Sequence, residues 1–482
     1  AQESRGLGDV YKRQVYGPIA GAPNIFNVVN LDKSQKKTPK TGWHEQTQSF
    51  FYSLELGWKS QLFVTTTGRN DWASQLANSP QKSFFYPSVG VSWLPSSTFN
   101  FPEKFNYLKI RASWASVANP FPRELTIATH PYDDTISGWD DKSNYPIGQL
   151  YPERTKTWEL GFDARFLHGF TLSASWYRAD TYNQTFNPNL SASSGYSDIY
   201  IQTGHVRNTG VEASLGYDHQ WKNWNWNSQF TFSWNKNKII ELCKEWYNPI
   251  TEETITMNRL QISKLGRAKF ILKEGGSMGD LYSTTDLRRD DKGNIEIDEG
   301  GNVVVEDNLP DMKLGSVFPD YDLAWRNSVS WKNLNLGFLV TARIGGIVNS
   351  LTQANMDLFG VSEATAAARD AGGALVNGRS LVNPETWYTA IASQGGIPQY
   401  YTYSATNVRL QELSLGYTIP RKWLHNVCSI TVSFVGRNLW MMYCKAPFDP
   451  EAVASTNNFY QGMDYFMMPS TRNLGFNINI KF

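Results

Sequence analysis

A serine framed by glycines is the first place in this sequence where covalent chemistry could occur. Residues Gly275 to Gly279 read GGSMG and fit the pattern G-x-S-x-G, in which a serine nucleophile lies on a sharp turn from a strand into a helix. The residues that follow, DLYSTTDLRRDDKGN, lack helical spacing, so the helix that the pattern requires is not expected. We therefore do not assign Ser277 as a nucleophile, and we expect that the protein is not an enzyme.

An acidic stretch is the next candidate site, in this case for a metal ion. Residues 290–301 read DDKGNIEIDEGG, and their acidic side chains do not have the spacing of an EF-hand calcium loop. A solvated hairpin that turns at Lys292-Gly293-Asn294 is the simpler interpretation. The histidines show neither an HExxH motif nor paired spacing, and they are His44, His130, His168, His205, His219 and His425. We expect no metal and no cofactor.

The three cysteines give no site either. Cys243, Cys428 and Cys444 are far apart and form no CxxC motif, so a zinc site or a redox pair is unsupported. Whether any two of them pair is left open by the sequence.

Composition excludes some partners and points to a strand-rich protein. Lys and Arg number 45 against 44 Asp and Glu, which gives a formal net charge of +1 and no indication of a nucleic-acid partner. Aromatic residues make up 14% of the 482 residues, while charged residues make up only 18%. No apolar run reaches the roughly 18 residues of a transmembrane helix. The best candidate, residues 333–347, carries Arg343 and three glycines.

Alternation of apolar and polar residues is the strongest pattern in the chain. The last ten residues, NLGFNINIKF, place Leu474, Phe476, Ile478, Ile480 and Phe482 on one face of a strand and polar residues on the other. The same alternation recurs in nine further segments, at 52–58, 89–93, 108–114, 158–166, 172–176, 230–234, 323–331, 334–342 and 428–434. We count about thirteen strands of roughly ten residues, the length that crosses a bilayer when tilted.

The connections between these strands are of two kinds. Short polar turns occur at "LHG" (167–169) and at two "WKN" sequences (221–223 and 331–333). Long irregular stretches lie near 118–152, 183–200, 240–318, 346–404 and 440–467, and residues 362–374 within them have the pattern of a short helix. Short turns at one rim and long loops at the other are typical of an outer-membrane barrel. The sequence therefore predicts an all-β fold, a transmembrane antiparallel β-barrel.

The two faces of the predicted strands support this fold class. Tryptophans cluster at strand ends, as in the aromatic girdles that lie at headgroup level. Charged residues occupy the opposite, inner face, and they are Glu55, Lys109, Arg111, Asp163, Arg165, Arg326 and Arg343. A water-filled interior permits such charges, whereas the packed core of a soluble β-sandwich or propeller, the alternative fold, predicts few of them.

The beginning of the chain does not follow the pattern. Residues 1–14, AQESRGLGDVYKRQ, fit neither a strand nor a helix period and contain no signal peptide. We interpret residues 1–14 as a ragged or non-native end, and residues 15–482 as a partial barrel.

Six stretches between about residues 150 and 482, together with a weaker match from about residue 45, resemble the SusC/RagA family of TonB-dependent outer-membrane transporters. Two of them are "LYPERTKTWELGFDARFLHGF" within 150–184 and "NVRLQELSLGYTIPRKWL" at 407–424. The other four lie at 203–217, 312–346, 435–452 and 462–482. All six follow the order that the family has.

The resemblance implies the architecture and the function. It implies a 22-stranded barrel with an internal plug domain, of which this chain would supply the C-terminal 13–14 strands without the plug. It implies import of oligosaccharides or peptides across the outer membrane, with a SusD-like lipoprotein at the mouth and with the TonB complex acting through a missing N-terminal part. A secreted glycan-binding β-protein and a passive porin are the alternatives.

The candidate site residues are few and all non-catalytic. Tyr196, Tyr400, Tyr401 and Tyr403 lie in loops and suit stacking on a sugar, although they equally suit packing at the rim. Phe482, the last residue of the sequence, suits a role as an assembly signal, because barrel proteins as a class resemble this chain in having an aromatic residue there. The alternative is that Phe482 is one more lipid-facing side chain.

Overall fold

The structure is a computed structural model, and it describes most of the chain. The described residues are 10–13, 18–19, 30–32, 40–122, 125, 132–133, 138–139, 144–145, 150–186, 198–248, 252–425, 427–455 and 460–482. Within these ranges no helix has both the length and the apolar character needed to cross a membrane.

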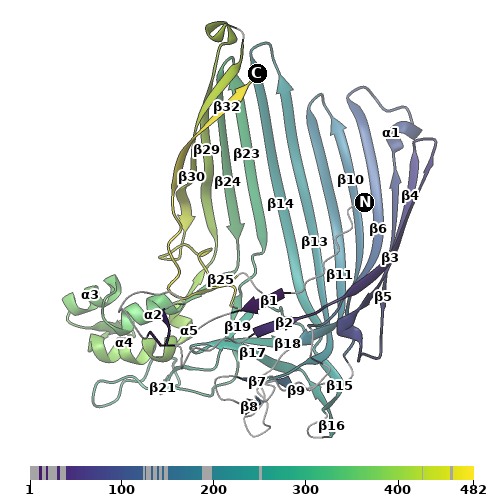
Figure 1. The fold of residues 1–482 in the computed structure, drawn as a ribbon. Coiled ribbons are helices and arrows are strands. Elements are labelled where there is room, and N and C mark those ends of the chain that lie inside the picture. Colours follow the sequence, from purple (N-terminus) through teal and green to yellow (C-terminus); the bar gives the residue numbers. More distant parts are fainter. Residues whose placement is uncertain are drawn as a thin grey trace.

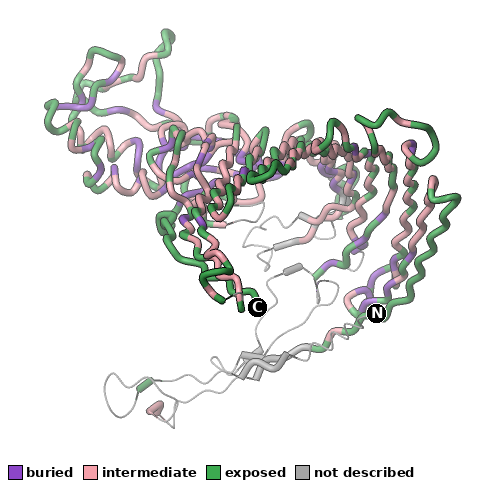
Figure 2. Tube along the Cα trace, turned by 90° about the horizontal axis from the view of Figure 1, so that it is seen from above, coloured by how far each residue is buried: buried purple, intermediate pink, exposed green. Residues whose placement is uncertain are grey.

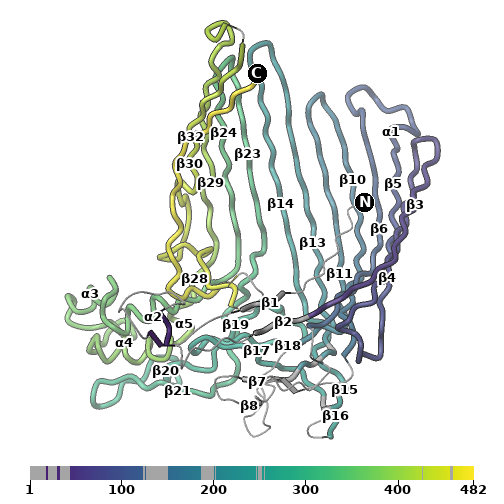
Figure 3. The backbone as a smooth tube through the Cα atoms, viewed as in Figure 1, coloured from purple at the N-terminus to yellow at the C-terminus, as the bar shows by residue number. Residues whose placement is uncertain are grey.

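One antiparallel sheet of thirteen strands dominates the molecule, and we call it the wall (Figure 1). Each wall strand pairs with the next wall strand along the chain, so the colours in Figure 3 run in order from purple to yellow across it. The count of about thirteen strands is confirmed. The strands are β3 (Thr47–Trp58), β4 (Leu62–Ala73), β5 (Phe84–Trp93), β6 (Phe105–Asn119), β10 (Glu153–Phe166), β11 (Phe170–Phe186), β13 (Ile201–Gln220), β14 (Trp224–Glu241), β23 (Tyr321–Trp331), β24 (Leu334–Ile344), β29 (Asn407–Ile419), β30 (Ser429–Cys444) and β32 (Asn473–Lys481).

Several wall strands are longer than the sequence pattern predicts. β32 has 9 residues, but β11 has 17, β14 has 18 and β13 has 20. The prediction of roughly ten residues is wrong for these strands, because the apolar alternation marks only their central part. The remaining residues extend the wall beyond the apolar band, where the outward positions are polar and backbone pairing alone continues the sheet.

Tight turns join the strands at one rim of the wall. The turn from β10 to β11 uses Leu167 and His168 at φ of 49° and 50°, followed by Gly169 at φ +137°. A side chain at Gly169 would meet the backbone oxygen of Asp218 at 2.4 Å, so only glycine fits there. The turns predicted at 167–169, 221–223 and 331–333 are confirmed.

The long connections all leave from the opposite rim. Their limits in the structure are 74–83, 120–152, 187–200, 242–320, 345–406 and 445–472. Residues 183–186, 240–241 and 440–444, which we predicted to be loop, instead continue β11, β14 and β30. Extra backbone pairing at this rim explains the shift, since Phe186 pairs with Ile201 and Cys444 pairs with Asn407.

The two longest connections are not irregular, as the sequence suggested, but folded. They form a lobe, which we define as residues 252–320 and 345–406 together with β31 (Met463–Asp464). Its four-stranded sheet contains, in order, β17 (Arg259–Leu265), β18 (Ala268–Lys273), β19 (Asp280–Ser283) and β22 (Met312–Ser316). In a second sheet β25 (Ile347–Ser350) lies between β28 (Thr402–Ser404) and β31. Two small pairs are β20 (Asp286–Leu287) with β21 (Val305–Glu306) and β26 (Ala374–Val376) with β27 (Ser380–Val382). Its helices are α2 (Leu351–Leu358), α3 (Glu363–Asp370), α4 (Pro384–Ala392) and α5 (Pro398–Tyr401).

The helix predicted at 362–374 is α3, which is shorter than predicted. Ser362 begins it, because its side-chain oxygen accepts a hydrogen bond from the backbone N–H of Thr365. Gly372 ends it at φ +75°, and the Gly372 N–H donates to the Arg369 carbonyl. A glycine in the left-handed region is the common stop signal of a helix, and it explains why the alanine-rich sequence does not continue.

Further short pairs of strands lie outside the wall, and one strand of the last pair, β16, falls within the lobe. They are β1 (Val10–Arg13) with β2 (Lys40–Trp43), β7 (Tyr132–Asp133) with β8 (Gly138–Trp139), β9 (Asn144–Tyr145) with β12 (Asp198–Ile199), and β15 (Cys243–Asn248) with β16 (Glu253–Met257), while α1 (Pro95–Thr98) lies between β5 and β6. Residues 10–13 are thus a strand, although we found no strand period there; residues 1–9 and Gln14 lie outside the described residues. The ragged or non-native end stays a prediction.

The wall curves into an arc, as the view from above in Figure 2 shows. On β10 the apolar Trp158 and Leu160 are exposed, whereas the polar Glu159 between them is partly buried. A curved sheet spreads side chains apart on its convex side, so the apolar set lies on the convex face and the polar set on the concave face. The two edge strands, β3 and β32, each pair with one wall strand only among the described residues.

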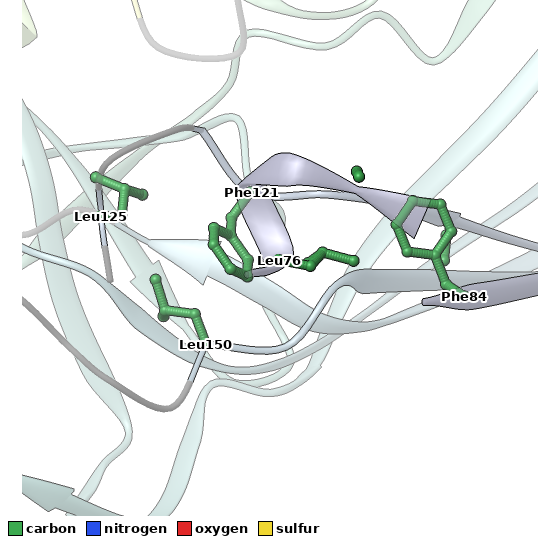
Figure 4. Close-up of a cluster of buried hydrophobic side chains, with 7 residues drawn as sticks. Leu76, Phe84, Phe121, Leu125 and Leu150 are labelled. Atoms are coloured by element: carbon green, nitrogen blue, oxygen red, sulfur yellow. The ribbon is translucent and has the colours of Figure 1, made fainter. Parts of the chain in front are cut away.

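Packed apolar cores lie at the long-loop rim. Figure 4 shows one of them, in which Leu76 and Phe84 meet Phe121, Leu125 and Leu150 from the connection that follows β6. Leu76 is 0% and Leu150 is 1% exposed. The loops of this rim are therefore anchored by buried side chains.

Candidate functional site

Polar side chains form continuous rows across the concave face of the wall. One row follows the strand register through Arg111, Gly161, Ser175, Glu212, Ser233, Asp322 and Arg343. All seven charged residues that we predicted for the inner face lie on this side by register. The concave surface is therefore hydrophilic from β3 to β24.

Arg111 is the centre of a fixed charge network on this face. Its Nη1 lies 2.7 Å from Oδ2 of Asp163, and its Nε lies 3.7 Å from Oε1 of Glu159. Ser173 Oγ donates a hydrogen bond of 2.7 Å to Oδ1 of Asp163. These contacts hold charged groups at defined positions along the interior.

A shallow cavity of about 520 Å³ lies beside Arg111 on the concave face. Small hydroxyl side chains dominate its polar lining, and they are Ser173, Ser175, Ser214, Thr231, Ser233 and Thr341. Short side chains leave room between the strands, and hydroxyl groups can donate and accept hydrogen bonds. Such a surface suits reversible binding of a polar molecule.

Aromatic rings border the convex face at two levels. Near the short turns, Trp224 and Trp331 stack with ring centroids 5.6 Å apart. Toward the long loops, Trp114 and Trp158 lie 6.2 Å apart. β23 has 11 residues and spans the apolar band, whose height in a barrel is about 25 Å. The predicted aromatic girdle therefore has both of its levels in the wall.

Polar groups within the apolar band are paired. Ser228 and Asn327 occupy outward positions, where Asn327 Nδ2 donates to Ser228 Oγ at 2.9 Å. The indole of Trp226 donates to Asn327 Oδ1 at 2.8 Å, and that of Trp325 donates to Ser228 Oγ at 3.0 Å. Because lipid offers no hydrogen bonds, such mutual pairing is what a membrane-facing polar pair requires.

The candidate tyrosines do not form one surface. Tyr401 is 2% exposed in the core of the lobe, where its hydroxyl donates to Oδ2 of Asp357 and burial raises its pKa. The prediction of Tyr401 as a substrate contact is therefore wrong, and rim packing is correct for it. Tyr400 packs against Trp387, Tyr403 packs against Phe448, and both keep partial exposure, so their role stays a prediction. Tyr196 lies outside the described residues.

A buried ion pair that the sequence did not single out joins the wall to the connection after β30. Arg409 on β29 is 4% exposed, and its Nη2 lies 2.8 Å from Oδ1 of Asp449 and 3.4 Å from Oε2 of Glu451. Burial works against ionisation of Asp449, yet the Arg409 hydrogen bond holds its pKa below the usual value. The signal was present, because both residues fall in stretches that resemble the family, at 407–424 and 435–452.

The residues considered for chemistry have structural roles. Ser277 lies between β18 and β19 with no helix after it, and its Oγ lies 3.3 Å from Oδ1 of Asn237. Asp290 closes the predicted hairpin, since its Oδ1 accepts from the backbone N–H groups of Lys292 and Asn294. Among the described residues, no group of three or more His, Cys, Asp or Glu side chains is placed to hold a metal ion.

The cysteines and the final residue are also placed. Cys243, Cys428 and Cys444 are free thiols, so the structure pairs none of them. Phe482 is 92% exposed and follows β32 at the short-turn rim, where Lys481 pairs with Ser429. Its role as an assembly signal stays a prediction.

The fold and its surfaces define a class of protein. A curved antiparallel wall with an apolar convex face, two aromatic levels and a polar concave face is that of a transmembrane β-barrel. The family model described as TonB dependent receptor-like, beta-barrel matches residues 4–439, and the chain belongs to that family of outer-membrane receptors and transporters.

Named relatives agree with this assignment. TonB-dependent receptor P3 of Formosa agariphila is 26% identical over 516 residues, which cover 98% of this chain and 50% of that protein. TonB-dependent receptor SusC of Bacteroides thetaiotaomicron is 21% identical over 404 residues, covering 78% of this chain and 38% of that protein. The chain thus spans about half the length, or less, of these relatives.

Solved structures share the fold. The RagAB peptide importer in its open-open state matches with a TM-score of 0.74 and 18% identity, over 96% of this chain and 50% of that one. Its closed-closed state matches with a TM-score of 0.73. At this level of identity the likeness shows the fold alone.

Proposed function

We propose that this chain supplies part of the wall and the external loops of a TonB-dependent importer for oligosaccharides or peptides. The observation that carries the proposal is the combination of a hydrophilic concave face with a folded lobe at one rim of the wall. The concave face would line the path of the substrate, and the lobe would stand at its extracellular mouth. Energy would come from the TonB complex, and no covalent step is required.

The two alternatives fit the observations less well. A secreted glycan-binding protein would have to keep the convex face in water, where Leu160, Leu336 and Phe230 are 54%, 46% and 42% exposed on β10, β24 and β14. Extraction from membranes only with detergent would exclude this alternative. A passive porin would import its substrate in the presence of a protonophore, whereas uptake energised through TonB would stop.

Uptake measurements would test the proposed substrate path. In the intact protein, Ser233→Trp places a bulky ring on the concave face beside the cavity, while Leu172→Trp places the same ring on the convex face. We expect Ser233→Trp to lower uptake of labelled oligosaccharides or peptides severalfold and Leu172→Trp to leave it unchanged. Equal uptake by both variants would place the path elsewhere.

A SusD-like surface lipoprotein is the proposed partner of the lobe. Around α2, α3 and the β26–β27 hairpin, Phe359, Val361, Leu375 and Leu381 are 75%, 72%, 64% and 61% exposed. Apolar residues gathered in this way are typical of an interaction surface. Phe359→Asp should abolish co-purification of the lipoprotein, while Val427→Asp, at a residue that is 66% exposed near the short-turn rim, should not.

The proposed orientation places the lobe outside the cell. An epitope inserted at Gly293, in the tip of an exposed hairpin, should be detected on intact cells. The same epitope inserted at Lys222, in a short turn, should be detected only after the membrane is opened. The reverse labelling would invert the topology.

A further inference from the structure

A set of cationic side chains continues the convex face beyond its aromatic border. On four successive wall strands, the outward positions on the long-loop side of the apolar band change from aromatic or aliphatic residues to Arg and Lys. Trp158, Arg178, Thr209 and Lys236 stand opposite one another in one row of the register. Lys156, Asp180, Arg207 and Lys238 form the next row.

We call five of these side chains the cationic patch, and they are Lys156, Arg178, Arg207, Lys236 and Lys238. The patch is confined to β10, β11, β13 and β14. On the neighbouring β6 the same two rows hold Trp114 and Ser116, and β23 begins at Tyr321, in the row below. The positive charge in these two rows is therefore a local patch on four strands and not a ring around the whole wall.

Asp180 organises the two arginines of the patch. Its side chain is 10% exposed, with Oδ2 lying 2.8 Å from Nε of Arg178 and Oδ1 lying 2.7 Å from Nε of Arg207. Oδ1 also lies 2.7 Å from Nε2 of His205. Because both ion pairs use Nε, Asp180 does not occupy the terminal guanidinium nitrogens. Arg178 remains 41% and Arg207 29% exposed, so these nitrogens can bind a further anion.

The lysines complete a surface with an excess of positive charge. Lys236 and Lys238 are exposed, and Lys156 lies with Nζ 5.2 Å from the ring centroid of Tyr182. Five cations thus stand around a single carboxylate that is itself buried. A cluster of this kind favours a ligand with more than one negative charge.

The depth of the patch identifies the class of ligand. Trp158 stands in the first of the two rows. Trp176 and Trp234 lie in the row directly below it, followed by the other apolar rows of the convex face. Indole rings of such borders lie at headgroup level, so side chains one or two rows further out meet the charged part of the lipid. A soluble anion would use the cations alone, whereas a lipid also uses the apolar rows.

We propose that the cationic patch binds the phosphate groups of a phosphorylated lipid in the outer leaflet, with the acyl chains lying on the apolar rows beneath. The inference rests on the proposed orientation of the lobe, but lipid binding is measured without transport. A protein that binds the lipid and imports nothing would contradict the proposed function and leave the patch in place.

The test uses the intact protein in mild detergent, with lipid A carrying two phosphates as the probe and lipid A carrying one phosphate as its matched control. Native mass spectrometry counts the bound lipid. We expect the doubly phosphorylated lipid to bind more tightly than the singly phosphorylated one. A quadruple variant of the patch should lose at least about tenfold in affinity, because its neutral side chains no longer make charge-assisted hydrogen bonds to phosphate. The quadruple variant carries Arg178→Gln, Arg207→Gln, Lys236→Gln and Lys238→Gln.

Two further variants separate the effect of the patch from loss of the Asp180 ion pairs and from a general loss of positive charge. Lys236→Gln with Lys238→Gln leaves the Asp180 ion pairs intact and should still weaken binding of the doubly phosphorylated lipid severalfold. A charge-matched control removes four cations from turns and should bind like the parent; it carries Lys59→Gln, Lys222→Gln, Lys292→Gln and Lys332→Gln.

Three results would overturn the proposal. The first is unchanged binding by both patch variants. The second is equal binding of lipids that carry two, one or no phosphates. The third is displacement of the lipid by inorganic phosphate at an equal concentration, which would assign the patch to a soluble anion.

Discussion

The wall and the lobe are built from one chain for two different solvents. Among the described residues, the largest fully buried side chains are Tyr401, Phe84, Phe270, Leu76, Leu150, Ile239, Leu242, Ile271, Leu272, Leu281, Ile397 and Met463. Within the wall, only Phe84 and Ile239 belong to this set, and both lie at the long-loop ends of their strands. The apolar band of the wall has no such core.

The difference shows what holds each region together. Wall strands are one layer thick, so their stability depends on backbone pairing and on lipid against the convex face. The lobe lies in water and buries apolar side chains in the usual way. A charge is therefore costly on the convex face of the wall, whereas a cavity or an unpaired charge is costly where the lobe and its neighbours pack.

The largest effect is expected where the wall meets the packed rim, at Arg409. Arg409→Ala would leave Asp449 and Glu451 without their cation, and breaking a buried pair from one side costs about 3–5 kcal/mol. The free energy of unfolding in detergent, followed by tryptophan fluorescence, measures the loss. Because the folded pKa of Asp449 is lowered, the contribution of the pair is present at neutral pH and lost on acidification.

Arg437→Ala is the matched control within the wall. Arg437 lies 3.3 Å from Glu412 on the neighbouring strand, but its side chain is 66% exposed. An exposed pair contributes about 0–1 kcal/mol. Equal losses for Arg409→Ala and Arg437→Ala would remove the distinction between the packed rim and the wall.

The second prediction concerns the two faces of one strand. Phe338→Arg puts a charge on the convex face, where it costs about 2–4 kcal/mol near the middle of the bilayer. Thr341→Arg puts the same charge on the concave face beside the cavity, where water solvates it. The amount of intact protein inserted into the membrane should fall for Phe338→Arg only. Equal tolerance of the two changes would reverse or abolish the assignment of the faces.

The third prediction uses an ion pair that lies wholly in the lobe. Asp311 accepts hydrogen bonds of 2.6 and 2.9 Å from Arg259, and this pairing, with help from Lys273 at 2.9 Å, lowers its pKa to about 2. Asp311→Asn should cost about 1.5–3 kcal/mol at pH 7. Because the folded pKa is depressed, the parent keeps this contribution above about pH 4 and loses it as the pH falls through about 2.

Asp322→Asn is the corresponding change in the wall. Asp322 is 57% exposed and lies 3.8 Å from Nε of Arg343, so its removal should cost less than about 1 kcal/mol. Unfolding measured at pH 7 and again near pH 2 should show a pH-dependent difference between parent and variant for Asp311→Asn alone. A similar pH-dependent difference for Asp322→Asn would mean that this ion pair of the wall contributes as much to stability as the Asp311 ion pair of the lobe.

The same contrast explains what the sequence could predict. Alternation is a local pattern, so the sequences of 158–166 and 474–482 predict both the strands and the residues that face lipid. β4 was less visible, because Thr66 stands in the apolar face of the strand between Thr65 and Thr67 of the other face, so the alternation is lost there. The lobe forms through distant pairs such as Ile295 with Asn377, 82 residues apart, and no local pattern shows them.

The candidate site divides in the same way. The charges of the concave face followed from alternation, and the structure places all seven of them there. Tyr401 looked like a loop aromatic because its burial depends on Asp357 and on other residues distant in sequence. The ion pair of Arg409 with Asp449 spans 40 residues, so no local pattern shows it, although both residues fall in stretches that resemble the family. The cationic patch was present in the alternation itself, since Lys236 and Lys238 continue the outward positions of Trp234.

The smallest effect on stability is expected at Phe482. Its side chain is 92% exposed, so Phe482→Ala removes little that the folded protein itself buries. If Phe482 is an assembly signal, the change lowers the amount of protein that reaches the membrane, while refolded protein unfolds in detergent as the parent does. An edge strand can be captured by strand addition during assembly, and an aromatic residue at its end would anchor it at the interface.

Phe476→Ala separates this signal from ordinary lipid contact. Phe476 lies on the same face of β32, is 79% exposed and packs edge-on against Phe434 at 5.7 Å. As a lipid-facing residue it should affect stability at least as much as Phe482, since both lose a similar apolar surface and Phe476 also loses its ring contact. Membrane levels that fall for Phe482→Ala and not for Phe476→Ala therefore identify a role that depends on position and not on burial. Equal membrane levels for both variants would make Phe482 one more lipid-facing side chain of the convex face, with no separate role in assembly.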